Sequence, residues 1–210
     1  MAITVTFQPD ATAGKDAKIR ANAATTNYGT TTDINVGAND GSGARVSGLI
    51  DFTEIVNIPR KAKIISAKVG LYYYNAWTGL GSISLLATPL LRNWTEAGVT
   101  WNTYDGTNAW ATAGATGNAD IDKDIGHLIE FPDRYSSYGW RYFYIADITF
   151  WKQWNRTYYG WLLYYIASSE HVSFYSSDYT TDITLRPKLI ITYEPYHKIY
   201  PVKSSLGQVK

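Results

Sequence analysis

The sequence predicts an all-β protein, an antiparallel β-sandwich of jelly-roll type with one or two short helices. Many short segments alternate between apolar and polar residues, which is typical of half-buried strands. Glycine, proline, asparagine and aspartate separate these segments, and one segment has helical spacing. With 210 residues, 45% of them hydrophobic, the chain is long enough to bury a core. Without an internal repeat or linker, we expect one domain over residues 1–194 and an extension over 195–210.

The first third of the chain contains the earliest strands. Ile3, Val5 and Phe7 alternate with threonines and predict a strand that ends before Pro9. Short strands follow at 17–20 and 34–36, separated by polar turn residues. The glycines of "GANDGSGA" mark a loop.

The segments "RVSGLIDF" and "AKIISAKVGLYYYN" predict two stronger strands, and "SISLLATPLL" continues the pattern. The second segment places different residues on its two faces because side chains alternate along a strand. One face holds Val69, Leu71 and Tyr73, and the other holds Gly70, Tyr72 and Tyr74. Residues 103–124 are rich in small and polar residues, so we expect a long connection with Trp110 as its anchor.

The segment "WRYFYIADITFWKQW" starts as a strand and ends as the best helix candidate. Asp147 or Thr149 can cap this helix, and Phe150, Trp151 and Trp154 lie at helical spacing. Three closing strands follow in "YYGWLLYYIA", "VSFYSS" and "PKLIITYE". Large rings on both faces of "YYGWLLYY" favour a buried strand over an exposed binding strip.

Composition excludes several classes of function. The absence of cysteine excludes disulfides, thiolate catalysis and cysteine zinc sites. A net charge of +1 argues against a nucleic-acid surface. No segment is apolar enough to predict a membrane span or a secretory signal. We therefore expect a protein that is made in the cytoplasm and either stays there or leaves by a route other than a cleaved signal, such as cell lysis.

No catalytic pattern stands out, so we expect no enzyme, no cofactor and no metal centre. The three histidines are far apart in sequence, and no nucleophile elbow or phosphate loop is present. The segment "DIDKDIG" resembles the start of an EF-hand loop but has Ile125 where glycine is required. The sequence leaves open whether scattered loop carboxylates such as Asp10 and Asp16 hold a structural calcium ion.

The segment "NWTEAGVTWN" places Glu96 between Trp94 and Trp101. A glycosidase would need a second carboxyl group across a cleft, and the sequence does not supply one. Val99 shares a strand face with Trp101, which favours a buried ring over a sugar platform. We expect Glu96 to accept hydrogen bonds from backbone or hydroxyl donors near Thr100.

Five blocks of sequence together resemble the DNRLRE domain, a family related to the disaggregatase repeat. The first four blocks are "FQPDATAGKDAKI", "TTNYGTTTDINVG", "RVSGLIDFTEIVNIPRKAKIISAKVGLYYY" and "NWTEAGVTWN". The fifth consists of the closing segments "YYGWLLYY", "FYSSD" and "RPKLIITYE". The resemblance implies a β-sandwich similar to jelly-roll carbohydrate-binding modules, some of which bind alginate. Related domains also occur in virion structural proteins.

Two hypotheses for the function follow. The first is a non-enzymatic structural protein of a bacteriophage or viral particle, as a capsid decoration or tail-associated component that is oligomeric in the assembly. Its location would be the virion or the extracellular surface, reached without a cleaved signal peptide. Its partners would be capsid or other virion subunits, contacted through the C-terminal extension by Tyr196, Lys198, Tyr200, Lys203 and Lys210.

The alternative is a carbohydrate-binding module for an acidic polysaccharide such as alginate. Sugar rings would stack on Tyr72, Tyr74, Trp77 or Trp140, and lysine or arginine would contact uronate carboxylates.

Overall fold

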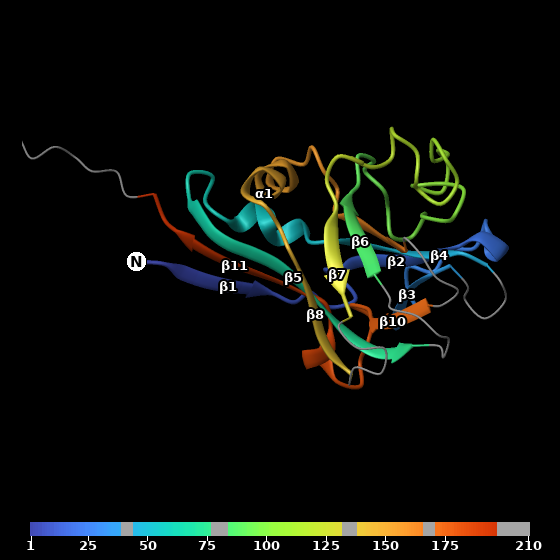
Figure 1. The fold of residues 1–210 in the computed structure, drawn as a ribbon, viewed down its shortest axis with the longest axis horizontal. Coiled ribbons are helices and arrows are strands. Elements are labelled where there is room, and N and C mark those ends of the chain that lie inside the picture. The colour runs from blue at the N-terminus through green and yellow to red at the C-terminus, as the bar shows by residue number, and fades with distance from the viewer. Residues whose placement is uncertain (39–43, 77–83, 132–137, 166–170, 197–210) are drawn as a thin grey trace, which may run out of the picture.

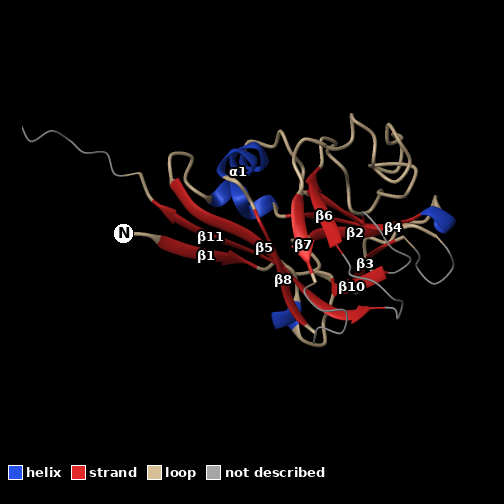
Figure 2. Cartoon of the chain, in the orientation of Figure 1, coloured by secondary structure: helices blue, strands red, loops and turns tan. Residues whose placement is uncertain are grey.

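A computed structural model of the chain describes residues 1–38, 44–76, 84–131, 138–165 and 171–196. The strands are β1 (Ile3–Phe7), β2 (Lys15–Arg20), β3 (Asp33–Gly37), β4 (Val46–Asp51), β5 (Lys63–Ala76), β6 (Ser84–Pro89), β7 (His127–Glu130), β8 (Gly139–Tyr144), β9 (Trp161–Tyr165), β10 (His171–Tyr175) and β11 (Lys188–Glu194). The helices are α1 (Asp147–Trp154) and the short 3-10 helices η1 (Ala21–Ala23), η2 (Thr53–Asn57) and η3 (Ile183–Leu185). The predicted all-β class is confirmed (Figures 1 and 2).

The strands form two antiparallel layers. In the first layer β1 pairs with β11, β11 with β5, β5 with β10 and β10 with β3, while β8 lies along the other side of β5. In the second layer the order is β2, β4, β9, β6 and β7. A pairing of Gly37 with Val46 connects the two layers between β3 and β4.

The main hydrophobic core lies between the layers, as expected for a sandwich. Val69, Leu71 and Tyr73 of β5 are buried there, which confirms the predicted faces of this strand. Trp161 and Leu163 of β9 contribute to the same core from the opposite layer. β9 is thus a buried strand rather than an exposed aromatic strip.

A second core lies on the other side of β4 and β9, under the long connection that follows β6. Leu49 and Leu162 point into it from the strands, and Trp94 and Trp110 cover them from the loop. The Nε1 of Trp110 donates a hydrogen bond of 3.0 Å to the carbonyl of Thr100, so Trp110 anchors the connection as predicted.

The predicted helix is confirmed as α1, but its predicted cap is wrong. Ala146 occupies the N-cap position and makes no side-chain capping bond, while Asp147 is the first helical residue. Phe150 is fully buried, and the Nε1 of Trp154 donates to the carbonyl of Ile58 at 2.8 Å. Packing of the aromatic side of α1 therefore compensates for the missing cap. Within the described ranges, no helix has the length and apolar character needed to cross a bilayer.

Candidate functional site

Aromatic side chains gather on the outward side of the first layer. Because alternate residues of a strand point to opposite sides, burial of Leu71 and Phe143 places their neighbours on the outside. β5, β8 and β10 each contribute rings to this surface, which we call the aromatic face. Its members are Tyr72, Tyr74, Trp140, Tyr142, Tyr144, Tyr175 and Tyr179.

Four tyrosines form a nearly parallel stack at one end of the aromatic face. The ring centroids of Tyr74 and Tyr175 are 4.2 Å apart with an interplanar angle of 6°. Tyr179 stacks on Tyr175 at 3.7 Å, and Tyr72 lies 6.0 Å from Tyr175 at 18°. The pKa of Tyr175 is raised to about 12, first by a side-chain hydrogen bond with Tyr179 and then by burial and the neighbouring tyrosines. Tyr175 therefore stays uncharged near neutral pH.

Trp140 and Tyr142 extend the aromatic face along β8. Trp140 meets Tyr72 edge to face at 5.5 Å, and its ring lies 6.2 Å from that of Tyr142. Gly70 makes room for both rings, since a Cβ atom there would lie 2.8 Å from Tyr142 Cε1 and 3.2 Å from Trp140 Cε3. The absent side chain lets the rings lie close to the sheet.

Two lysines accompany these rings. The Nζ of Lys188 is 3.4 Å from the Trp140 ring centroid, and the Nζ of Lys68 is 4.4 Å from that of Tyr142. Burial, followed by the nearby charge of Lys68, lowers the pKa of Lys188.

Neither lysine forms an ion pair with any carboxylate of the described residues. Lys18 differs, because its Nζ lies 2.6 Å from Asp33. Lys68 and Lys188 thus leave positive charge uncompensated beside the aromatic rings.

The structure brings three of the four predicted ligand-binding residues together. Tyr72, Tyr74 and Trp140 belong to the aromatic face, whereas Trp77 lies outside the described residues. Sequence reasoning missed the remaining members of the face and its two lysines. They are Tyr142, Tyr144, Tyr175, Tyr179, Lys68 and Lys188. The alternation in "GWRYFY" could have revealed Tyr142 and Tyr144, but Tyr175 and Tyr179 required the strand pairing.

Of the predicted partner-contacting residues, only Tyr196 falls within the described part of the chain. Its side chain is exposed, and the Nζ of Lys61 lies 5.4 Å from its ring centroid. The others lie outside the described residues. They are Lys198, Tyr200, Lys203 and Lys210.

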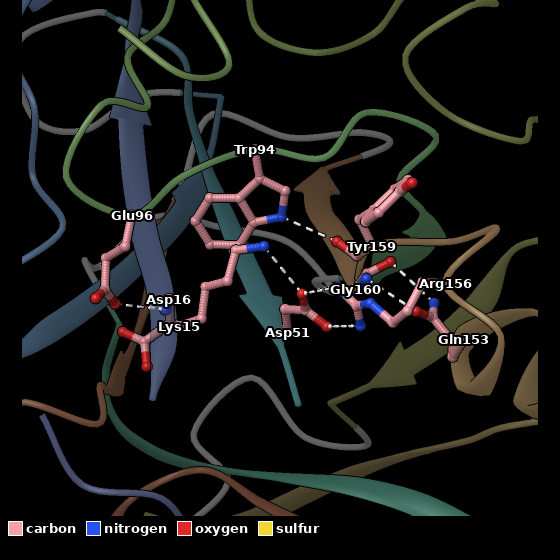
Figure 3. Close-up of polar contacts among 9 residues, drawn as sticks. All are labelled: Lys15, Asp16, Asp51, Trp94, Glu96, Gln153, Arg156, Tyr159 and Gly160. Carbon is pink, nitrogen blue, oxygen red and sulfur yellow. Dashed lines mark hydrogen bonds and ion pairs between the residues drawn. The ribbon is translucent and has the colours of Figure 1, made fainter. Parts of the chain in front are cut away.

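Trp94 and Glu96 each join separate segments of the chain through hydrogen bonds (Figure 3). Trp94 is fully buried, and its Nε1 donates to the carbonyl of Tyr159 at 2.9 Å. Glu96 accepts a hydrogen bond of 2.8 Å from the backbone N–H of Asp16 on β2. The prediction of a backbone or hydroxyl donor for Glu96 is right, because the donor is a backbone N–H. The prediction that this donor lies near Thr100 is wrong. Thr100 Oγ1 itself accepts from the backbone of Asn102 and Thr103.

The EF-hand-like segment also has a structural role. Asp120 is fully buried and accepts from the backbone N–H groups of Ala111, Thr112 and Gly117. Asp122 accepts from the hydroxyl of Tyr158. These two carboxylates are therefore already engaged by donors of the protein.

A β-sandwich with partly exposed aromatic rings on one sheet offers a surface that suits ligand binding, and the function has to be argued from that surface rather than from the fold. The model of carbohydrate-binding module family 96 matches residues 8–122, more than half of the chain. The chain belongs to this family, which is one of binding modules. No curated protein matches the sequence. The match covers Tyr72 and Tyr74 and ends before β8 and β10.

Proposed function

We propose that the protein is a non-catalytic carbohydrate-binding module that holds an acidic polysaccharide on the aromatic face. The observation that carries the proposal is the pairing of partly exposed rings with lysines that form no ion pair among the described residues. Sugar rings stack on aromatic side chains through their C–H faces, and the half-buried rings of Trp140 and Tyr72 would provide this contact. Lys68 and Lys188 supply cations for uronate carboxylates at the same place. A polymer such as alginate combines both features. We also propose that the chain is related to the DNRLRE domains that its sequence resembles.

Calorimetry with alginate and with a neutral glucan tests the proposal. We expect millimolar to micromolar binding of alginate, weakened by added salt because exposed charges are screened, and weaker binding of the glucan. Trp140→Ala is expected to lower the affinity for alginate by about 3- to 10-fold, the worth of one aromatic contact. Lys188→Met is also expected to lower the affinity for alginate, and the loss should be larger at low salt than at high salt.

Two matched control variants accompany these substitutions. Tyr196→Ala removes an exposed ring that lies outside the aromatic face, and Lys63→Met removes an exposed lysine at the far end of β5. Both are expected to bind alginate like the wild-type protein. The proposal is wrong if the protein binds no acidic glycan, or if the control variants lose as much affinity as Trp140→Ala and Lys188→Met.

The role in a virion, expected first from the sequence, has less support. The family match favours carbohydrate binding, and most of the predicted docking residues lie outside the described part of the chain. It remains a separate proposal, in which deletion of residues 196–210 leaves a folded monomer but abolishes incorporation into particles. Normal incorporation of the truncated chain would contradict it.

A further inference from the structure

Three carboxylates that are distant in sequence meet at one edge of the sandwich. Asp16 lies on β2, Glu96 in the connection after β6, and Asp178 in the segment after β10. One oxygen atom from each lies within 4.8 Å of the other two. Figure 3 shows the carboxylates of Asp16 and Glu96 side by side.

The three acidic groups concentrate negative charge, which Lys15 near Glu96 and Arg186 near Asp178 offset only from a distance. Burial, together with the charges of Glu96 and Asp178, raises the pKa of Asp16 to about 7, although the hydrogen bond from the backbone N–H of Ser177 opposes the shift. Burial raises the pKa of Glu96 and of Asp178 as well. Within the described residues, none of the three forms an ion pair. The nearby Lys15 directs its Nζ to Asp51 instead, at 3.0 Å.

Ser177 provides an independent observation at the same place. It is 1% exposed, and its Oγ has no hydrogen-bond partner among the described residues. Its backbone N–H donates to Asp16 Oδ2 at 2.9 Å, and its hydroxyl is close enough to this carboxylate to act on the pKa of Asp16. An unsatisfied buried hydroxyl carries a desolvation cost that a ligand at this position would remove.

Two glycines allow the segments to approach this closely. A Cβ atom on Gly14 would lie 2.2 Å from Ser177 Oγ, and one on Gly29 would lie 2.4 Å from the carbonyl oxygen of Glu96. The hydrogen bond from the Asp16 N–H to Glu96 Oε1 fixes the third segment. The oxygen atoms are thus held in place by the fold.

We propose that Asp16, Glu96 and Asp178 bind a calcium ion, with the hydroxyl of Ser177 as a further oxygen ligand. Calcium takes six to eight oxygen ligands in flexible geometry, so water would complete the shell. The donor set contains only oxygen, which selects a hard cation over zinc or copper. The ion would join β2 to two connections and would fix the residue before Tyr179 of the aromatic face.

Calcium binding can be measured on the full chain without any glycan, so its outcome is independent of the proposed function. Protein stripped with EDTA and dialysed is titrated with calcium chloride by calorimetry. We expect one binding site and, at about 100-fold excess over Kd, a rise in Tm of about 5 °C or more. Magnesium is expected to bind more weakly because it requires a strict octahedral shell.

Variants separate this site from adventitious binding by surface acids. Glu96→Gln and Asp178→Asn are each expected to weaken calcium binding about tenfold or more, since affinity follows ligand charge. Asp124→Asn, at an exposed aspartate of the EF-hand-like segment, is expected to bind as the wild type does. Terbium luminescence sensitised by nearby tyrosine gives a second readout on wild-type protein, with calcium displacing terbium.

The proposal is overturned if wild-type protein shows neither heat nor a shift in Tm with calcium. It is equally overturned if magnesium binds more tightly, or if folded Glu96→Gln and Asp178→Asn variants retain wild-type affinity. Circular dichroism establishes that each variant is folded.

Discussion

Replacement of Asp51 by asparagine tests the buried ionic network beside β4. The Asp51 side chain is 1% exposed and accepts hydrogen bonds from Arg156 Nη1 at 3.0 Å and from Arg156 Nη2 at 2.7 Å. Lys15 Nζ adds a third contact at 3.0 Å. Asparagine removes the charge and leaves two cations together without their anion.

The expected cost follows from the burial of the three groups. Loss of one partner from a buried ion pair costs about 3–5 kcal/mol. Because Lys15 is 15% exposed and Arg156 is 27% exposed, water recovers part of their solvation, and we expect about 2–4 kcal/mol. In urea unfolding this would lower the midpoint by about 1–2 M.

The pH dependence gives the same experiment a second readout. Burial alone would raise the pKa of Asp51, but hydrogen bonds from Arg156 and the charges of Lys15 and Arg156 outweigh it and lower the pKa. A folded pKa below the unfolded value of about 3.9 gives a stabilisation that is complete above that value and is lost as the pH falls through the folded pKa. The difference between wild type and Asp51→Asn should therefore be constant between about pH 5 and 8 and should shrink below about pH 4.

A matched control is Glu194→Gln, which removes an exposed ion pair with Lys63 at 3.9 Å. We expect it to change the free energy of unfolding by less than about 0.5 kcal/mol. If Asp51→Asn costs no more than this control, or if its effect does not change with acid, the reasoning about the buried network is refuted.

Three further substitutions test the two close approaches at glycines and the hydrogen bond of Trp94. Gly70→Ala should displace the two rings that lie over it and weaken alginate binding in calorimetry by about 3-fold or more, with unchanged affinity contradicting the role of this glycine. Gly160→Ala should cost about 2 kcal/mol or more in urea unfolding, because φ is +79° and the added Cβ would lie 2.1 Å from the Ile50 carbonyl. Trp94→Phe should cost about 1–3 kcal/mol by loss of the hydrogen bond to the carbonyl of Tyr159; a neutral result would show that this bond is dispensable.

The faces of individual strands could be predicted because the information is local. In β5, alternation alone separates Val69 and Leu71 from Tyr72 and Tyr74, and the structure confirms the separation. The helix could be predicted for the same reason, from the spacing of its aromatic residues. Its cap could not, because tertiary packing of Phe150 made a capping side chain unnecessary.

The composition of the aromatic face depends on pairing between distant strands. Tyr175 meets Tyr74 because β10 pairs with β5 in a register that places Ser173 opposite Asn75. A shift of that register by one residue would turn Tyr175 to the other side of the sheet. The sequence of β10 alone contains no signal for this register.

The partner of Glu96 illustrates the same limit. A carboxylate in a turn commonly binds donors of that turn, and this general rule predicted a partner near Thr100. The actual donor is the backbone of Asp16, eighty positions earlier in the chain. Only the assembled sandwich brings β2 beside this connection.

The pairing of β1 with β11 has a practical consequence for attaching the protein to a surface or a reporter. Ile3 lies opposite Tyr193, and Glu194 lies opposite Lys63 at the start of β5. A tag fused before Ile3 or after Glu194 would leave from the same end of the molecule. Tyr74 lies up to about 36 Å farther along β5. Immobilisation through either tag would therefore leave the stacked tyrosines accessible to a long polymer.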